Sequence, residues 1–273
     1  MMTITWMILD WVSLLMSTGS KVSQIEIISA DWPAAENIHA LSTTRNLHQG
    51  VGVSEGAYAC LNLAQHVEDE PAHVKENRQL LRQRLKLPEE PLWLDQVHGN
   101  NIVDVSSHLT TSADASFSFE KNRVCAVMTA DCLPVLICNR QGNKVAAVHA
   151  GWRGLADGVI EASIKSLKEK PENLLVWLGP AIGPRAFEVG EEVRQVFIDD
   201  LALCESAFKQ NRPGHYLADI YQLARLRLKR MGIEAVYGGE YCTCTDTDHF
   251  YSFRRDGTTG RQASLIWFGE HSS

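Results

Sequence analysis

The sequence predicts an α+β fold, with a single domain in which mixed β-sheets are flanked by helices. Short apolar runs of the kind that form buried strands occur along the whole chain, and longer segments with a period of about 3.6 residues lie between them. The two kinds of segment do not alternate strictly, which disfavours a doubly wound parallel sheet. A chain of 273 residues can bury one large core, and no linker rich in Gly, Ser or Pro divides it.

The expected elements follow one another in chain order. Strands are predicted over 25–29 and 39–44, and a Gly-rich loop over 46–57 comes after them. Pro71 suits the first turn of an amphipathic helix over 71–87. Beyond this helix, the pattern predicts strands over 124–128, 135–138, 144–149, 174–178, 236–237 and 263–268, and helices over 159–167, 191–201 and 218–231.

Composition narrows the class of protein. The net charge is −7 and basic residues are interspersed with acidic ones, which disfavours a nucleic-acid partner. Seven cysteines, an odd number, do not resemble the disulfide framework of a small secreted domain, so we expect a cytoplasmic protein. The apolar start of the chain is too short for a membrane span of ~20 residues, and no Lys or Arg precedes it. We therefore predict that 1–22 is a disordered or non-native extension and that 23–270 is the folded domain.

Three potential metal ligands each stand beside a Gly or Pro, in runs that we interpret as strand ends. They are His98, Cys132 and His149. Two imidazoles and one thiolate leave a fourth position of a tetrahedral zinc ion open, and the soft thiolate favours Zn or Cu over Mg or Ca. However, a single His is usually just hydrogen-bonded, a buried Cys is usually inert, and this wide spacing matches no short zinc motif. The residues alone leave both interpretations open.

Other polar residues are ambiguous in the same way. Arg153 opens a predicted helix, where free amides favour an anion, and Arg45 precedes the Gly-rich loop. Either could instead be an arginine that pairs at the surface. Arg78 is expected to pair with a carboxylate on its own helix. The Cys242-Thr243-Cys244 run is interpreted as structural, because no second pair of ligands accompanies it.

Seven segments together resemble the YfiH/YlmD family, which is also called the laccase-domain or multicopper polyphenol oxidase family. The likeness extends from about residue 25 to 268 in the same order and at compatible spacing. The segments are Thr43-Thr44-Arg45, Leu61-Asn62-Leu63, Gln96-Val97-His98-Gly99, Thr129-Ala130-Asp131-Cys132-Leu133-Pro134-Val135, Ala147-Val148-His149-Ala150-Gly151-Trp152-Arg153-Gly154, Leu178-Gly179-Pro180-Ala181-Ile182-Gly183 and Phe250-Tyr251-Ser252-Phe253-Arg254-Arg255.

The resemblance implies a single α+β catalytic domain and a metal, usually zinc with copper as the alternative, held by His98, Cys132 and His149. It implies purine nucleoside phosphorylase activity on adenosine, inosine, guanosine and S-methyl-5′-thioadenosine, with adenosine deaminase activity at the same site and no organic cofactor. Two departures from the family pattern stand out. Residues 46–49 separate Arg45 from the Gly50 run, and residues 1–22 have no counterpart.

A single metal ion suits some of these chemistries better than others. A laccase needs several copper ions and many His ligands, yet no His-X-His pair occurs among the ten histidines, so the polyphenol oxidase becomes the alternative. In phosphorolysis, phosphate attacks ribose C1′, which requires nearby cations and a proton donor at the base. In deamination, a water whose pKa the metal lowers towards ~7 attacks purine C6.

We assign roles on this basis as hypotheses. Arg45 and Arg153 contact phosphate or ribose, and Asn62 is a further polar contact. Asp131 orients a ligand or moves a proton, so that Asp131 and Arg153 are the catalytic candidates beside the metal ligands. The partners are then purine nucleosides and phosphate, with no membrane or nucleic acid, in a monomer or weak homo-oligomer. A binding module that a metal only stabilises remains the non-enzymatic alternative.

Overall fold

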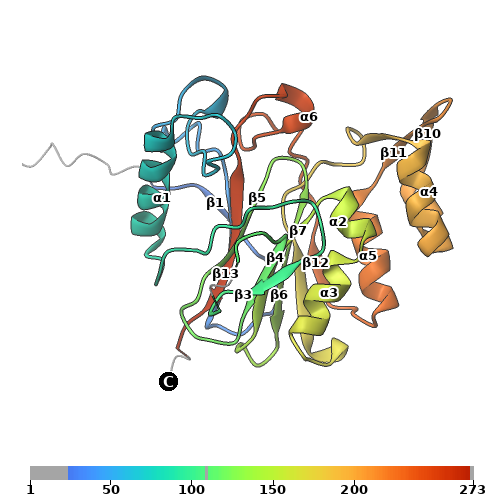
Figure 1. The fold of residues 1–273 in the computed structure, drawn as a ribbon, viewed down its shortest axis with the longest axis horizontal. Coiled ribbons are helices and arrows are strands. Elements are labelled where there is room, and N and C mark those ends of the chain that lie inside the picture. The colour runs from blue at the N-terminus through green and yellow to red at the C-terminus, as the bar shows by residue number, and fades with distance from the viewer. Residues whose placement is uncertain (1–23, 108–109, 271–273) are drawn as a thin grey trace, which may run out of the picture.

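The computed structural model describes residues 24–107 and 110–270, so the predicted extension over 1–22 lies outside the described residues. Within this part the chain forms one α+β domain with mixed sheets, which confirms the predicted fold class. Figure 1 shows its layers, which run from helix α1 through two packed sheets to helices α3 and α5. None of the described helices is long and apolar enough to cross a membrane.

The central layer is a six-stranded sheet. It consists, in spatial order, of β12 (Val236–Gly238), β8 (Leu174–Leu178), β6 (Leu133–Asn139), β7 (Val145–Ala150), β4 (Ala115–Ser118) and β3 (Ile102–Asp104). Every residue of β6, β7 and β8 is buried, because both faces of the sheet are covered. This double burial explains why these strands are continuous apolar runs in the sequence.

A four-stranded sheet covers one face of the central sheet. Its strands, in order, are β1 (Ile27–Ser29), β2 (Ile38–Thr43), β13 (Gln262–Phe268) and β5 (Cys125–Thr129). The alternation along β5 divides its side chains between two cores. Val127 packs between the sheets, whereas Ala126 and Met128 face the core under α1 (Pro71–Leu85).

Helices α3 (Val159–Ser166) and α5 (Ile220–Arg230) cover the other face of the six-stranded sheet and bury the largest core with it. Asp219 caps α5 by accepting the backbone N–H of Gln222, so the helix begins two residues after the predicted start. The remaining elements are η1 (Gly56–Tyr58), α2 (Trp152–Ala156), η2 (Pro171–Asn173), β9 (Glu188–Gly190), α4 (Glu191–Asp200), η3 (Ala202–Ala207), β10 (Phe208–Arg212), β11 (His215–Ala218) and α6 (Phe253–Asp256).

The predicted strands and helices all occur, with shifted ends, but several short elements were missed. The missed strands are β3, β4, β9, β10 and β11, and α6 was also missed. Arg153 was expected to open a helix and lies in α2, but the predicted range of 159–167 fits only α3. These elements are short or polar. In β4, for example, Ser116 and Ser118 are fully buried although serine is not typical of a core strand. Their periodicity is therefore too weak to identify them.

Candidate metal centre and adjoining pocket

The register of the six-stranded sheet brings three distant segments to one edge. Strands β6 and β7 are antiparallel with Leu133 opposite Ala150, so Cys132, just before β6, lies beside the end of β7 that carries His149. Strand β4 pairs with the other side of β7, and β3 is parallel to β4. The start of β3 therefore reaches the same edge, where the preceding loop carries His98.

The three predicted metal ligands converge at this edge. One ligand atom from each of His98, Cys132 and His149 lies within 4.8 Å of the others, and the two imidazole rings meet edge-on with centroids 4.8 Å apart. His149 is 3% exposed and Cys132 is partly buried, whereas His98 is exposed. Cys132 precedes β6 and His149 lies in β7 as predicted, but His98 lies in a loop before β3 and not at a strand end.

The space between these side chains is kept open by a glycine. A Cβ at Gly151 would lie 2.8 Å from His98 Nδ1 and 3.2 Å from Cys132 Sγ, closer than real Cβ atoms normally come. Any larger residue would therefore fill the space that faces both ligand atoms. The nitrogen and sulfur donor set suits zinc or copper, so the residues present fit a single metal ion.

Sequence reasoning missed Asp114, a fully buried carboxylate that holds the site together. Its Oδ1 is 2.8 Å from His149 Nδ1 and also accepts the backbone N–H of His98 at 2.9 Å, while Oδ2 accepts the N–H of Gly99 at 2.7 Å. The carboxylate thus orients the His149 ring and fixes the His98 loop, where His98 has a left-handed φ of 61°. An isolated Asp before a short polar strand gives no recognisable signal in the sequence.

The charges of these groups are coupled. Burial raises the pKa of the Cys132 thiol. The charge of His149 and hydrogen bonds from both histidines outweigh this effect, so the net pKa lies below the normal value. Burial lowers the pKa of His149, but Cys132 and Asp114 outweigh this and raise it. The cluster therefore favours a thiolate, the form in which cysteine binds a metal.

Asp131, a predicted catalytic residue, lies beside Cys132 but binds other parts of the protein. Its φ is 93°, and its Oδ1 accepts the Thr243 hydroxyl at 2.7 Å. Its Oδ2 accepts the N–H of Arg254 at 2.6 Å, in the first turn of α6. Asp131 therefore holds α6 and the Thr243 segment against the turn that presents Cys132.

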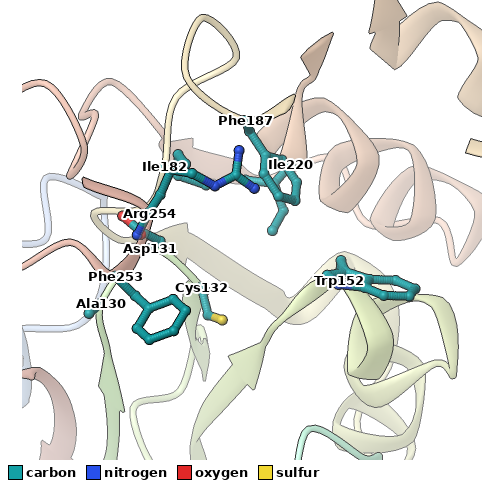
Figure 2. A pocket seen from close by; sticks show the side chains of 9 residues that line it. All are labelled: Ala130, Asp131, Cys132, Trp152, Ile182, Phe187, Ile220, Phe253 and Arg254. Atoms are coloured by element: carbon teal, nitrogen blue, oxygen red, sulfur yellow. The ribbon is translucent and has the colours of Figure 1, made fainter. Parts of the chain in front are cut away.

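An apolar pocket of about 120 Å³ adjoins the cluster. Figure 2 shows the Cys132 sulfur pointing into the space between the side chains of Phe253 and Trp152. Phe187, Ile182, Ile220 and Arg254 line the far side of the pocket. Phe253 is 60% exposed although it is aromatic, so a flat apolar ligand could cover it.

The predicted polar contacts have different surroundings. Arg45 donates from Nε and one amino group to the Ala59 carbonyl, and Asn62 is fully buried with its amide bonded to Ala64, Asp69 and the Arg261 N–H. Both therefore brace internal segments. Arg153 is exposed, and its guanidinium lies 4.4 Å from the centroid of the Trp152 ring, beside the pocket.

The prediction for Arg78 is wrong. It forms no ion pair with a carboxylate within the described ranges 24–107 and 110–270. Instead, its Nε donates to the Leu63 carbonyl at 2.9 Å and its guanidinium lies 4.3 Å from the centroid of the Trp93 ring. The residues three and four positions away on α1 are Val74, Lys75, Leu81 and Arg82, so the helix offers Arg78 no carboxylate on its own face.

The fold and the cluster together define a class, namely α+β proteins that carry a three-ligand site of the metal-binding type at a sheet edge. Residues 39–269 match the family described as multi-copper polyphenol oxidoreductase laccase, and the chain belongs to this family. Among the residues that the structure describes, only one group of three His, Cys or carboxylate side chains converges as a ligand set. That count suits one metal ion better than a multi-copper centre.

Named relatives connect the chain to YfiH and YlmD, as the resemblance indicated. It is 52% identical over 244 residues to the purine nucleoside phosphorylase YfiH of Shigella flexneri, which covers 89% of this chain and 98% of the relative. A crystal structure of a Neisseria meningitidis protein superposes with a TM-score of 0.85 at 48% identity, over 89% of this chain and 99% of the other. YlmD from Geobacillus stearothermophilus gives 0.80 at 29% identity, over 91% and 99%.

Proposed function

We propose that this protein is a metal-dependent purine nucleoside phosphorylase that acts on adenosine, inosine, guanosine and S-methyl-5′-thioadenosine, with 23–270 as the catalytic domain. The observation that carries the proposal is the convergence of His98, Cys132 and His149 at the mouth of an apolar pocket. The name of the Shigella flexneri relative, which is similar along almost its whole length, supports the same reaction class.

His98, Cys132 and His149 would hold zinc, with copper as the alternative, and the ion would supply a Lewis acid with one exchangeable position. Asp114 keeps Nδ1 of His149 engaged, which leaves Nε2 for the ion. Asp131 fixes the turn that presents Cys132, so we assign it a positioning role.

The pocket is proposed to receive the purine. Phe253 and Trp152 offer aromatic faces on either side of the space into which Cys132 points, and a purine ring can stack on such faces. Arg153, exposed beside Trp152, is proposed to contact the ribose. Arg45 and Asn62, which the sequence suggested as contacts to phosphate or ribose, hydrogen-bond to the Ala59 and Ala64 carbonyls, so we propose a supporting role for them.

The proposed reaction exchanges one bond at ribose C1′ for another. An oxygen of hydrogen phosphate forms a bond to C1′ while the bond from C1′ to the purine nitrogen breaks. The proton of the hydrogen phosphate ends on the departing purine, so the products are ribose 1-phosphate and the free base. Adenosine deamination is proposed as a second activity of the same centre, in which water replaces the C6 amino group and ammonia leaves.

Cys132→Ala tests the proposal directly. The variant is expected to fold, to bind less metal, and to release adenine or hypoxanthine more than about 100-fold more slowly in the presence of phosphate, because a Lewis acid contributes several kcal/mol. Cys244→Ala, at a partly buried cysteine outside the cluster, is the matched control. Full activity in Cys132→Ala would remove the cluster from the mechanism.

The two alternatives predict other outcomes in the same samples. A binding module stabilised by metal would melt at a lower temperature after chelation but turn over no nucleoside in any state. A polyphenol oxidase would consume dioxygen with phenols after copper loading. We expect phosphate-dependent cleavage and no phenol-dependent dioxygen uptake.

A further inference from the structure

Three basic residues lie on segments that meet at Leu63, outside the positions assigned so far. Arg78 on α1 donates to the Leu63 carbonyl at 2.9 Å, and the Leu63 N–H donates to the Arg261 carbonyl at 3.3 Å. His66 follows Leu63 in the same loop. The pKa of His66 is lowered by burial and by the positive charges of Arg261 and Arg78, as expected when three basic groups share one region.

This basic cluster of His66, Arg78 and Arg261 borders the metal centre. In the pairing of β13 with β5, Gln262 lies opposite Thr129, so Arg261 lies opposite Ala130 at the start of the turn that carries Cys132. Burial lowers the pKa of Arg261, and the negative charges of Cys132 and Asp131 oppose this effect. Arg261 is therefore in electrostatic contact with the centre as well as with the cluster.

Negative charges act on both arginines, Glu90 on Arg78 and Cys132 with Asp131 on Arg261, without forming an ion pair with either. Neither Arg78 nor Arg261 forms an ion pair among the residues described here, and each uses only part of its guanidinium for protein contacts. Arg78 bonds through Nε, and Arg261 bonds through one amino group to the carbonyls of Thr259 and Gly260. Burial lowers the pKa of Arg78 to about 10. Partly buried, unpaired cations cost free energy unless an anion joins them.

We propose that Arg78 and Arg261, assisted by His66, bind the phosphate that takes part in the reaction. The inference rests on the proposed function and gives its anionic substrate a place. The free N–H groups of two guanidinium ions match the oxygens of a phosphate, which arginine binds through paired hydrogen bonds. The predicted alternatives serve less well, because Arg45 is bonded to the Ala59 and Thr247 carbonyls and Arg153 stacks on Trp152.

The test titrates inorganic phosphate into the metal-loaded protein by calorimetry, without nucleoside. Arg261→Gln and Arg78→Gln are each expected to weaken phosphate binding by about 10- to 100-fold, because a hydrogen bond to a charged group is worth ~1.5–3 kcal/mol. Arg82→Gln, one turn further along α1 and exposed, is the matched control and should bind phosphate as the wild type does. Arg78→Lys keeps the charge and should recover part of the affinity.

Kinetics then separate this inference from the function on which it rests. Both glutamine variants should raise the KM for phosphate by the same factor and change the KM for the nucleoside less than about twofold. Unchanged phosphate KM in both variants, with phosphorolysis intact, would overturn the site but keep the function. Phosphate binding lost in the variants, with no cleavage even by the wild type, would keep the anion site and overturn the function.

Two further outcomes of these experiments each have a defined interpretation. If Arg261→Gln does not fold, as judged by its thermal unfolding, Arg78→Gln and Arg78→Lys decide the question alone. A protein that binds adenosine 5′-monophosphate through these arginines but not inorganic phosphate would contradict the proposal, because the anion would then belong to a nucleotide.

Discussion

Two pairs of arginines differ in the groups that face them. Arg227 and Arg230 on α5 share the carboxylates of Glu161 and Asp200, with nitrogen–oxygen distances between 2.8 and 3.1 Å. Helix α1, which carries Arg78, lies on the opposite side of the two sheets from α5 (Figure 1). Arg78 and Arg261 meet backbone carbonyls, and Arg78 also lies over the Trp93 ring.

The difference distinguishes Arg227 and Arg230, whose role is structural, from Arg78 and Arg261, which we propose bind a ligand. The α5 pair links α5 to α3 and to the end of α4, and its charge is neutralised inside the protein. Arg78 and Arg261 form no ion pair within the described part of the chain, so a bound anion would offset the cost of their partial burial. Substitutions in the first pair should therefore affect stability, and substitutions in the second should affect phosphate binding.

The largest effect is expected from Arg227→Met. Arg227 is 3% exposed, so its loss leaves Glu161 short of a buried partner and should reduce the free energy of unfolding by about 3 kcal/mol. Denaturant unfolding measures this change. Arg230→Met, whose side chain is 36% exposed, should cost less than about 1 kcal/mol. A raised KM for phosphate in folded Arg227→Met would contradict the distinction between the two pairs of arginines.

Gly151→Ala is expected to have the next largest effect. The new methyl group would displace His98 and Cys132 from the ligand positions, and a displacement of about 1 Å can reduce a rate about 100-fold. Metal content after dialysis, measured by elemental analysis, should fall with it. Gly99→Ala is the control, because its Cβ would have only ordinary contacts, the nearest at 3.7 Å. Equal metal content in Gly151→Ala and wild type would contradict the proposed ligand geometry.

Asp114→Asn tests whether the buried carboxylate of Asp114 positions the metal ligands. An amide keeps one acceptor but loses the charge that orients His149, so metal affinity should fall by about 10- to 100-fold. Competition with a metal-binding dye measures it. Asp104→Asn, at the end of β3 that lies away from the His98 loop, should leave the affinity unchanged. If both variants bind metal equally well, Asp114 does not position the ligands.

Much of the fold and part of the site could be predicted from the sequence, for identifiable reasons. Strands buried on both faces, such as β6 and β7, are continuous apolar runs. His98, Cys132 and His149 stand out because a Gly or Pro follows each of them closely. Their convergence was a prediction that the sheet register confirms.

The remaining features depend on pairings that no local pattern encodes. Asp114 meets His149 only because β4 pairs with β7. Arg261 lies near Ala130 only because β13 pairs with β5. Arg78 on α1 donates a hydrogen bond to the carbonyl of Leu63, which lies in the loop before the helix. The sequence suggests Asn62 and Arg45 as ligand contacts, but it does not reveal that Asn62 is buried or that both side chains form hydrogen bonds within the protein.

The most direct test of the account follows the products of inosine cleavage by the metal-loaded protein over a range of phosphate concentrations. The account predicts equal amounts of hypoxanthine and ribose 1-phosphate, formed only when phosphate is present and at a rate that saturates with it. Hypoxanthine released at the same rate without phosphate, or none at any phosphate concentration, would contradict it.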